Sequence, residues 1–179
     1  MRRFGRAARG FLAGSPTSLL KLANQLLTEK QCAQLELDER KRPGSIWFPP
    51  ECRKEMFTLF FTAYNPTAGQ TDSTPCVAGG TNYDLCEMAR NGQRTIALSQ
   101  DLIKWAAGEN APFGKGDLVW LESTTIPNDP RCNGTFTVAD AMNARFRKKG
   151  DIFVMNKKDN LSCKAKIYKI TLPKVKKTI

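Results

Sequence analysis

The sequence of 179 residues contains no histidine. This absence excludes Ser-His and Cys-His nucleophile systems, an imidazole general base and zinc sites with histidine ligands. The chain also lacks any apolar run close to the roughly 20 residues of a membrane-spanning helix, so we expect no transmembrane segment. Any acid–base chemistry therefore falls to carboxylates, and we expect neither a metal nor a cofactor.

The composition is ordinary for a globular protein, with 41% hydrophobic and 25% charged residues. The length fits one domain with an appendage. We expect an anchoring or assembly segment over residues 1–53 and a folded domain with a basic C-terminal tail over residues 54–179.

The positive charge is concentrated at the two ends of the chain. The net charge is +11, yet residues 54–144 hold 6 Lys/Arg against 10 Asp/Glu. The most aromatic stretch, 57–64, has almost no cations nearby, whereas grooves for single-stranded nucleic acid interleave cations with aromatics. We therefore expect nucleic acid not to be a partner and assign the charge to attachment.

The first ten residues are rich in arginine, but no clean apolar segment follows them. This pattern is typical of a basic arm and a poor match to a secretory signal. From Leu19 to Leu27 apolar residues recur at helical spacing, and Ser15 followed by Pro16 fits a helix start. The pattern predicts an amphipathic helix over 16–39.

Strand patterns dominate the rest of the chain. We expect strands over 56–64, 95–98, 117–122, 134–139, 151–155 and 164–172, and one short helix over 99–107. Six short strands with a single helix predict a small closed barrel of the mainly β class.

Six cysteines, at positions 32, 52, 76, 86, 132 and 163, form no CxxC pair. Their even number permits disulfides without fixing the connectivity, and six buried free thiols also fit. Cys76 and Cys86 are the best local pair, whereas Cys132 and Cys163 each begin a predicted strand and could be neighbours. Cys32 and Cys52 are the remaining disulfide candidates.

Three carboxylates stand in distinctive positions. Asp72 lies in a polar loop, Asp140 ends an apolar strand and Asp151 begins another. Partial burial at a strand end raises the pKa of a carboxylate, and two neighbouring carboxylates split their pKa values. Spacing alone equally allows Asp140 to cap the next turn and Asp151 to pair with Arg145 or Arg147.

An ordered set of short motifs covers about residues 57–172. The motifs are FTAY at 61–64, QTDSTPC at 70–76, Cys86, TIA at 95–97, PFG at 112–114, FTVAD at 136–140, Met142-Asn143, Arg145 and DIF at 151–153. Together they resemble the three-aspartate (3D) domain family, which includes the barrel of membrane-bound lytic murein transglycosylase A and is similar to the barrel of rare lipoprotein A.

The resemblance implies a six-stranded double-psi β-barrel, preceded here by a helical extension, with a cleft for peptidoglycan glycan strands. It implies that Asp151 is the general acid and base, that Asp140 is its hydrogen-bonded partner, and that Asp72 lies in the loop over the cleft. The remaining substrate-binding positions would be Thr62, Tyr64, Asn143 and Arg145. A subset of the family also has a cysteine pair matching Cys76 and Cys86, which implies a disulfide.

Two hypotheses about location and activity accompany the resemblance. Without an export signal, such a barrel could reach the cell wall on a bacteriophage particle or in the envelope, with residues 1–53 bound to other virion or envelope proteins. Related proteins have an arginine directly after the first aspartate, where this chain has Ala141. The alternative is therefore a catalytically inactive barrel that serves as a building block of a phage tail, neck or baseplate.

Overall fold

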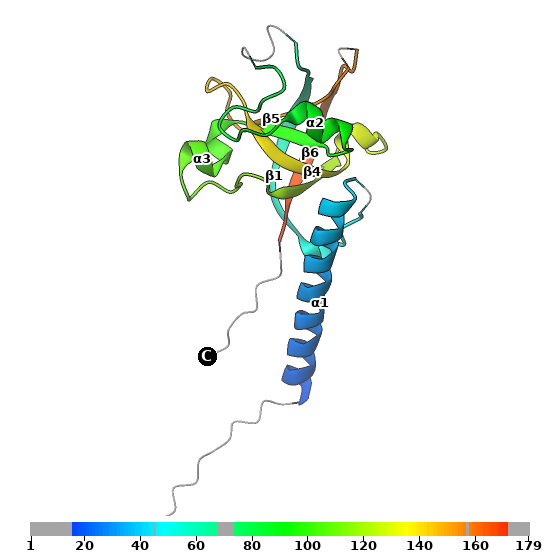
Figure 1. Ribbon diagram of the computed structural model, residues 1–179. Coiled ribbons are helices and arrows are strands. Elements are labelled where there is room, and N and C mark those ends of the chain that lie inside the picture. The colour runs from blue at the N-terminus through cyan, green and yellow to red at the C-terminus, as the bar shows by residue number, and fades with distance from the viewer. Residues whose placement is uncertain (1–15, 45, 68–73, 157, 172–179) are drawn as a thin grey trace, which may run out of the picture.

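The computed structural model describes residues 16–44, 46–67, 74–156 and 158–171, and shows a small barrel with one long helix (Figure 1). The helices are α1 (Pro16–Lys41), α2 (Leu85–Arg90) and α3 (Lys104–Ala107), with single 3-10 turns at Pro50–Cys52, Gln100–Leu102 and Pro130–Cys132. The strands are β1 (Arg53–Tyr64), β2 (Thr95–Leu98), β3 (Leu118–Ser123), β4 (Gly134–Ala141), β5 (Lys149–Phe153) and β6 (Ser162–Ile170).

The six strands close in the order β1-β5-β2-β4-β3-β6. The pairs β1–β5 and β2–β4 are parallel, and the other four pairs are antiparallel. Strand β5 lies between β1 and β2, and β2 lies between β4 and β5. The strands β1 and β2 thus enclose β5, and the strands β4 and β5 enclose β2. This interlocked order is the double-psi arrangement, so the expected barrel is confirmed.

The barrel interior is filled by alternating residues of every strand. In β6, for example, Cys163, Ala165 and Ile167 are buried while their neighbours are more exposed. Phe61, near the end of β1, is fully buried and packs tightly on Gly150 of β5, where an added Cβ would overlap its ring. Such aromatic core residues typically contribute about 3–5 kcal/mol each, so the interior fixes the strand positions on which the outer face depends.

The C-terminal part of α1 is fixed to the barrel. A disulfide joins Cys32 to Cys52, and both lie in an apolar cluster with Phe48, Leu118 and Ile170. Beyond this contact the N-terminal half of α1 extends away from the barrel (Figure 1). Within the described residues, no helix is both long and apolar enough to span a membrane.

The single helix expected over 99–107 is wrong in detail. The segment forms a 3-10 turn and then α3, separated by Ile103 with an extended backbone. Ile103 is completely buried and forms an isolated bridge with Phe113. Because the Ile103 side chain packs into the core, the backbone is extended at this residue and the helix is interrupted.

Candidate functional site

Four residues on neighbouring strands lie in one row across the outer face of the barrel. Asp140 of β4 pairs with Ala97 of β2, Ala97 pairs with Asp151 of β5, and Asp151 pairs with Thr62 of β1. Two strand spacings of about 4.8 Å place the Cα atoms of the two aspartates about 10 Å apart. The row brings together two carboxylates that are eleven positions apart in the sequence.

A β-bulge in β4 aligns this row. Ile96 pairs with Val138, but the next residue, Ala97, pairs with Asp140, which leaves Ala139 as the extra residue. Without the bulge, Ala139 would lie opposite Ala97. Bulges commonly redirect side chains next to functional sites, and this one turns a carboxylate toward the outer face.

Asp151 is the third residue of β5, not its first as the sequence predicted. Its carboxylate is half-buried and accepts a hydrogen bond from the Thr62 hydroxyl. Burial raises the pKa of Asp151 above its ordinary value, although the bond from Thr62 and the charge of Lys149 act in the opposite direction. The carboxyl group thus retains a proton to higher pH than an exposed aspartate.

Asp140 is held by two donors near the end of β4. Its Oδ2 accepts from the Tyr64 hydroxyl at 3.1 Å, and its Oδ1 accepts from the Ala141 N–H at 2.8 Å. Burial, reinforced by Asp140, raises the pKa of Tyr64 well above its usual value, so Tyr64 remains a donor. The Tyr64 ring packs edge-on against Phe153 at 5.3 Å, which fixes this contact.

An open cleft of about 1070 Å³ lies over the row. Asp140, Asp151 and Tyr64 form part of its lining. Trp105 of α3 contributes another part, next to Gly80, where an added Cβ would lie 3.1 Å from the indole Nε1. The loop after β4 completes the lining with Asn143, Ala144, Arg145 and Phe146.

The expected disulfide between Cys76 and Cys86 is present, and it braces the cleft wall. It joins the loop before α2 to α2 itself, a helix that no sequence pattern predicted. Asp84 caps α2 by accepting from the Glu87 N–H at 2.8 Å, and Leu85 packs into a small apolar cluster with Tyr64. The capping aspartate was the available sequence signal for this short helix.

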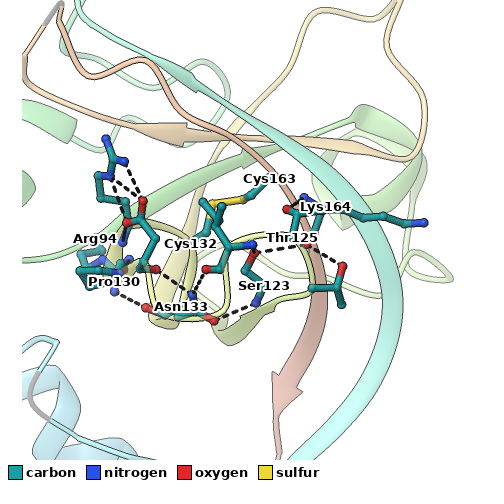
Figure 2. The surroundings of a disulfide bond; sticks show 12 residues. Arg94, Ser123, Thr125, Pro130, Cys132, Asn133, Cys163 and Lys164 are labelled. Atoms are coloured by element: carbon teal, nitrogen blue, oxygen red, sulfur yellow. Dashed lines mark hydrogen bonds and ion pairs between the residues drawn. A yellow bond between two sulfur atoms is a disulfide. The ribbon is translucent and has the colours of Figure 1, made fainter.

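The disulfide between Cys132 and Cys163 lies in the barrel core, beside a network of hydrogen bonds (Figure 2). The Asn133 side chain accepts from the Ser123 N–H at 2.8 Å and donates to two carbonyls of the intervening loop. The Arg94 guanidinium donates to the carbonyls of Pro130 and Asn133, and burial lowers its pKa to about 10. All six cysteines form disulfides, so the free-thiol alternative is wrong.

Cys132 itself closes a 3-10 turn before β4 and does not begin a strand. Cys163 is the second residue of β6. Their adjacency nevertheless follows the expectation, because β4 and β6 both flank β3.

The structure brings most of the expected site residues together. Asp140, Asp151 and Tyr64 line the cleft with Asn143 and Arg145, and Thr62 binds Asp151 from the side. Asp72 lies outside the described residues, so its place over the cleft stays a prediction, as does a hydrogen bond between the two carboxylates. Within the described residues, Asp151 bonds to Thr62 and forms no ion pair with Arg145 or Arg147.

Several features of the cleft could not be expected from sequence. They are the bulge at Ala139, the indole of Trp105, the close approach of Gly80, and the position of Phe146. The pair Gly79-Gly80 was a signal of close backbone approach, but its partner is 25 residues away in α3 and could not be inferred.

One group of potential metal ligands occurs among the described residues, and it consists of Cys76, Asp84 and Cys86. The two sulfur atoms are bonded to each other and are therefore not thiolate ligands. This group does not fit a metal site in the disulfide-bonded protein.

Comparisons with family models, with curated proteins and with solved structures each returned no match for this chain.

Proposed function

We propose that this protein cleaves peptidoglycan glycan strands as a lytic transglycosylase, with Asp151 as its single acid–base group. One observation carries the proposal: a half-buried carboxyl of raised pKa, bonded to Thr62, lies in one row with Asp140 in the floor of an open cleft. Perturbed carboxylates in clefts are candidates for acid–base catalysis, and no histidine is present to share this work.

The reaction requires two proton transfers at one group. Protonated Asp151 donates its proton to the glycosidic oxygen as the bond from C1 of N-acetylmuramic acid breaks. The resulting carboxylate then accepts the proton of the C6 hydroxyl, whose oxygen forms the new bond to C1. The product is a 1,6-anhydro sugar, no water is consumed, and Asp151 returns to its protonated form.

Asp140 acts in this proposal as a positioning residue. Its bonds to Tyr64 and the Ala141 N–H fix the end of β4 and the loop that carries Asn143 and Arg145. An inverting hydrolase would instead use the second carboxylate to activate water, and a retaining one would use it as the nucleophile.

A digest of purified sacculi in heavy-oxygen water tests the proposal. We expect anhydro-muropeptides without incorporated heavy oxygen, detected by mass spectrometry, and their loss in Asp151→Asn. Reducing ends that carry heavy oxygen would identify a hydrolase and overturn the transglycosylase assignment.

A second function, a structural barrel in a phage tail, neck or baseplate, is favoured by two observations. Ala141 stands where members of the family that the sequence resembles have an arginine, and α1 extends beyond the barrel from a base fixed by the Cys32–Cys52 disulfide. In either function we propose that residues 1–53 attach the barrel to other virion or envelope proteins. The three disulfides fit an oxidising location such as a particle or the envelope.

A further inference from the structure

The cleft has opposite charge at its floor and at one edge. The floor holds the carboxyl groups of Asp140 and Asp151. Arg145 lines the cleft and begins a run of four cations, Arg145, Arg147, Lys148 and Lys149, which we call the basic rim. All four are exposed, and none forms an ion pair within the part of the chain that the structure describes.

Phe146 connects the basic rim to the cleft. Its ring lines the cleft, the Arg145 guanidinium lies 4.8 Å from the ring centroid, and the Lys149 ammonium lies 5.7 Å from it. Two cations thus lie within cation–π distance of one aromatic ring, which holds their charges near the cleft.

The backbone of the rim is held in a defined turn. Lys148 has a positive φ of 48°, and its N–H donates to the Asp101 carboxylate at 3.3 Å. Asp101 thus binds the rim through a backbone N–H, and the charge of Lys149 partly offsets the effect of burial, which raises the pKa of Asp151. The cations themselves remain available to a ligand.

We propose that the basic rim is an anion subsite, and that it binds the carboxylates of peptide-bearing glycan strands while their uncharged sugars occupy the floor. The inference rests on the proposed function and deepens it by naming the substrate class. A uniformly anionic polymer such as nucleic acid is disfavoured, because its phosphates would lie against Asp140 and Asp151.

The test compares the binding of glycan strands whose stem peptides carry charged carboxylates with the binding of the same strands after these carboxylates are neutralised. Soluble glycan strands carrying stem peptides are used directly or after conversion of their carboxylates to methylamides. Binding is measured by calorimetry at low salt in the Asp151→Asn protein, which prevents turnover. We expect amidation to weaken binding about fivefold, the range of two exposed ion pairs, and this difference to shrink as salt rises.

The double substitution Arg145→Gln/Lys149→Gln in that protein removes the two rim cations beside Phe146 and should reduce the difference between the two strand preparations. The matched control, Arg90→Gln/Lys54→Gln, removes one arginine and one lysine that are exposed and do not line the cleft, and should keep it. The inference would be overturned if the rim variant showed the same binding difference between native and amidated strands as the Asp151→Asn protein. It would also be overturned if the Asp151→Asn protein showed no such difference. If the protein bound neither strand preparation, the proposed function would be contradicted. If it bound duplex DNA more tightly than the strands, and this binding depended on the rim, the ligand would be nucleic acid and not a glycan.

Discussion

At the scale of single residues, the account depends on the protonation of Asp151. Two groups oppose the effect of burial on its pKa, and Thr62 is the larger because it donates directly to the carboxylate. The hydroxyl stabilises the charged form. Thr62 therefore lowers the pH at which Asp151 loses its proton from the value that burial alone would give.

Thr62→Val should move the alkaline limb of the rate profile to higher pH. Loss of the hydroxyl removes a hydrogen bond to the carboxylate, raises the pKa of Asp151 further, and keeps the acid protonated over a wider range. The measurement is kcat/KM against pH on soluble strands. Thr58→Val, on the same strand and face but opposite Lys166, is the control and should leave the limb in place. If the alkaline limb moved to lower pH in Thr62→Val, the role assigned to the hydrogen bond from Thr62 to Asp151 would be contradicted.

Asp151→Asn should stabilise the protein at neutral pH. Because burial raises the pKa of Asp151 in the folded state, ionisation costs stability at pH 7, and the amide removes this cost. We expect the Tm at pH 7 to rise by roughly 1–3 °C. The difference should vanish below about pH 3.9, where the carboxyl is neutral in both folded and unfolded chains. Asp159→Asn, in a loop outside the cleft, serves as the comparison, and a lowered Tm at pH 7 would contradict the argument.

The sequence singled out the two carboxylates of the cleft but not the contacts that hold them. Asp140 and Asp151 were found from their places beside apolar strands and from the resemblance. The resemblance also named Thr62 and Tyr64, but not their hydrogen bonds to Asp151 and Asp140, which join residues 89 and 76 positions apart. Local pattern cannot specify such contacts.

At the scale of elements, the two disulfides of the barrel have separate roles. Cys132–Cys163 closes 31 positions within the core, whereas Cys76–Cys86 closes 10 positions at the cleft wall. The entropy of loop closure grows slowly with loop length, so the longer connection should contribute more to stability.

Cys132→Ala/Cys163→Ala should lower the free energy of unfolding by about 4 kcal/mol, and Cys76→Ala/Cys86→Ala by about 3 kcal/mol, as measured by urea denaturation. At a temperature where both variants remain folded, only the second should lose cleavage activity, because it releases the wall that carries Gly80. Greater loss of activity in the core variant would contradict this division.

The strand positions were predicted to within a few residues because alternation is a local signal. The short β2 was predicted with its observed bounds, 95–98. The break at Ile103 and the bulge at Ala139 were missed, since both arise where the core or a neighbouring strand imposes a position on the backbone.

At the scale of the whole molecule, the charge separates two surfaces. The sequence placed the positive charge at the chain ends, and the fold brings part of the C-terminal share, Arg145 to Lys149, back to the edge of the cleft. The barrel class was predictable from six alternating segments. The closed order and its two parallel pairs followed only from the resemblance, because each depends on crossovers between distant strands that local patterns do not specify.

The central claim is that one carboxyl in the cleft cleaves glycan strands. The most direct measurement is the yield of anhydro-muropeptides from purified sacculi for the wild-type protein, Asp151→Asn and the control Asp159→Asn. The account predicts equal release by the wild type and the control, and at least a hundredfold loss in Asp151→Asn, in the range of an acid–base group. Undiminished release by Asp151→Asn, or no release by the folded wild type, would contradict it.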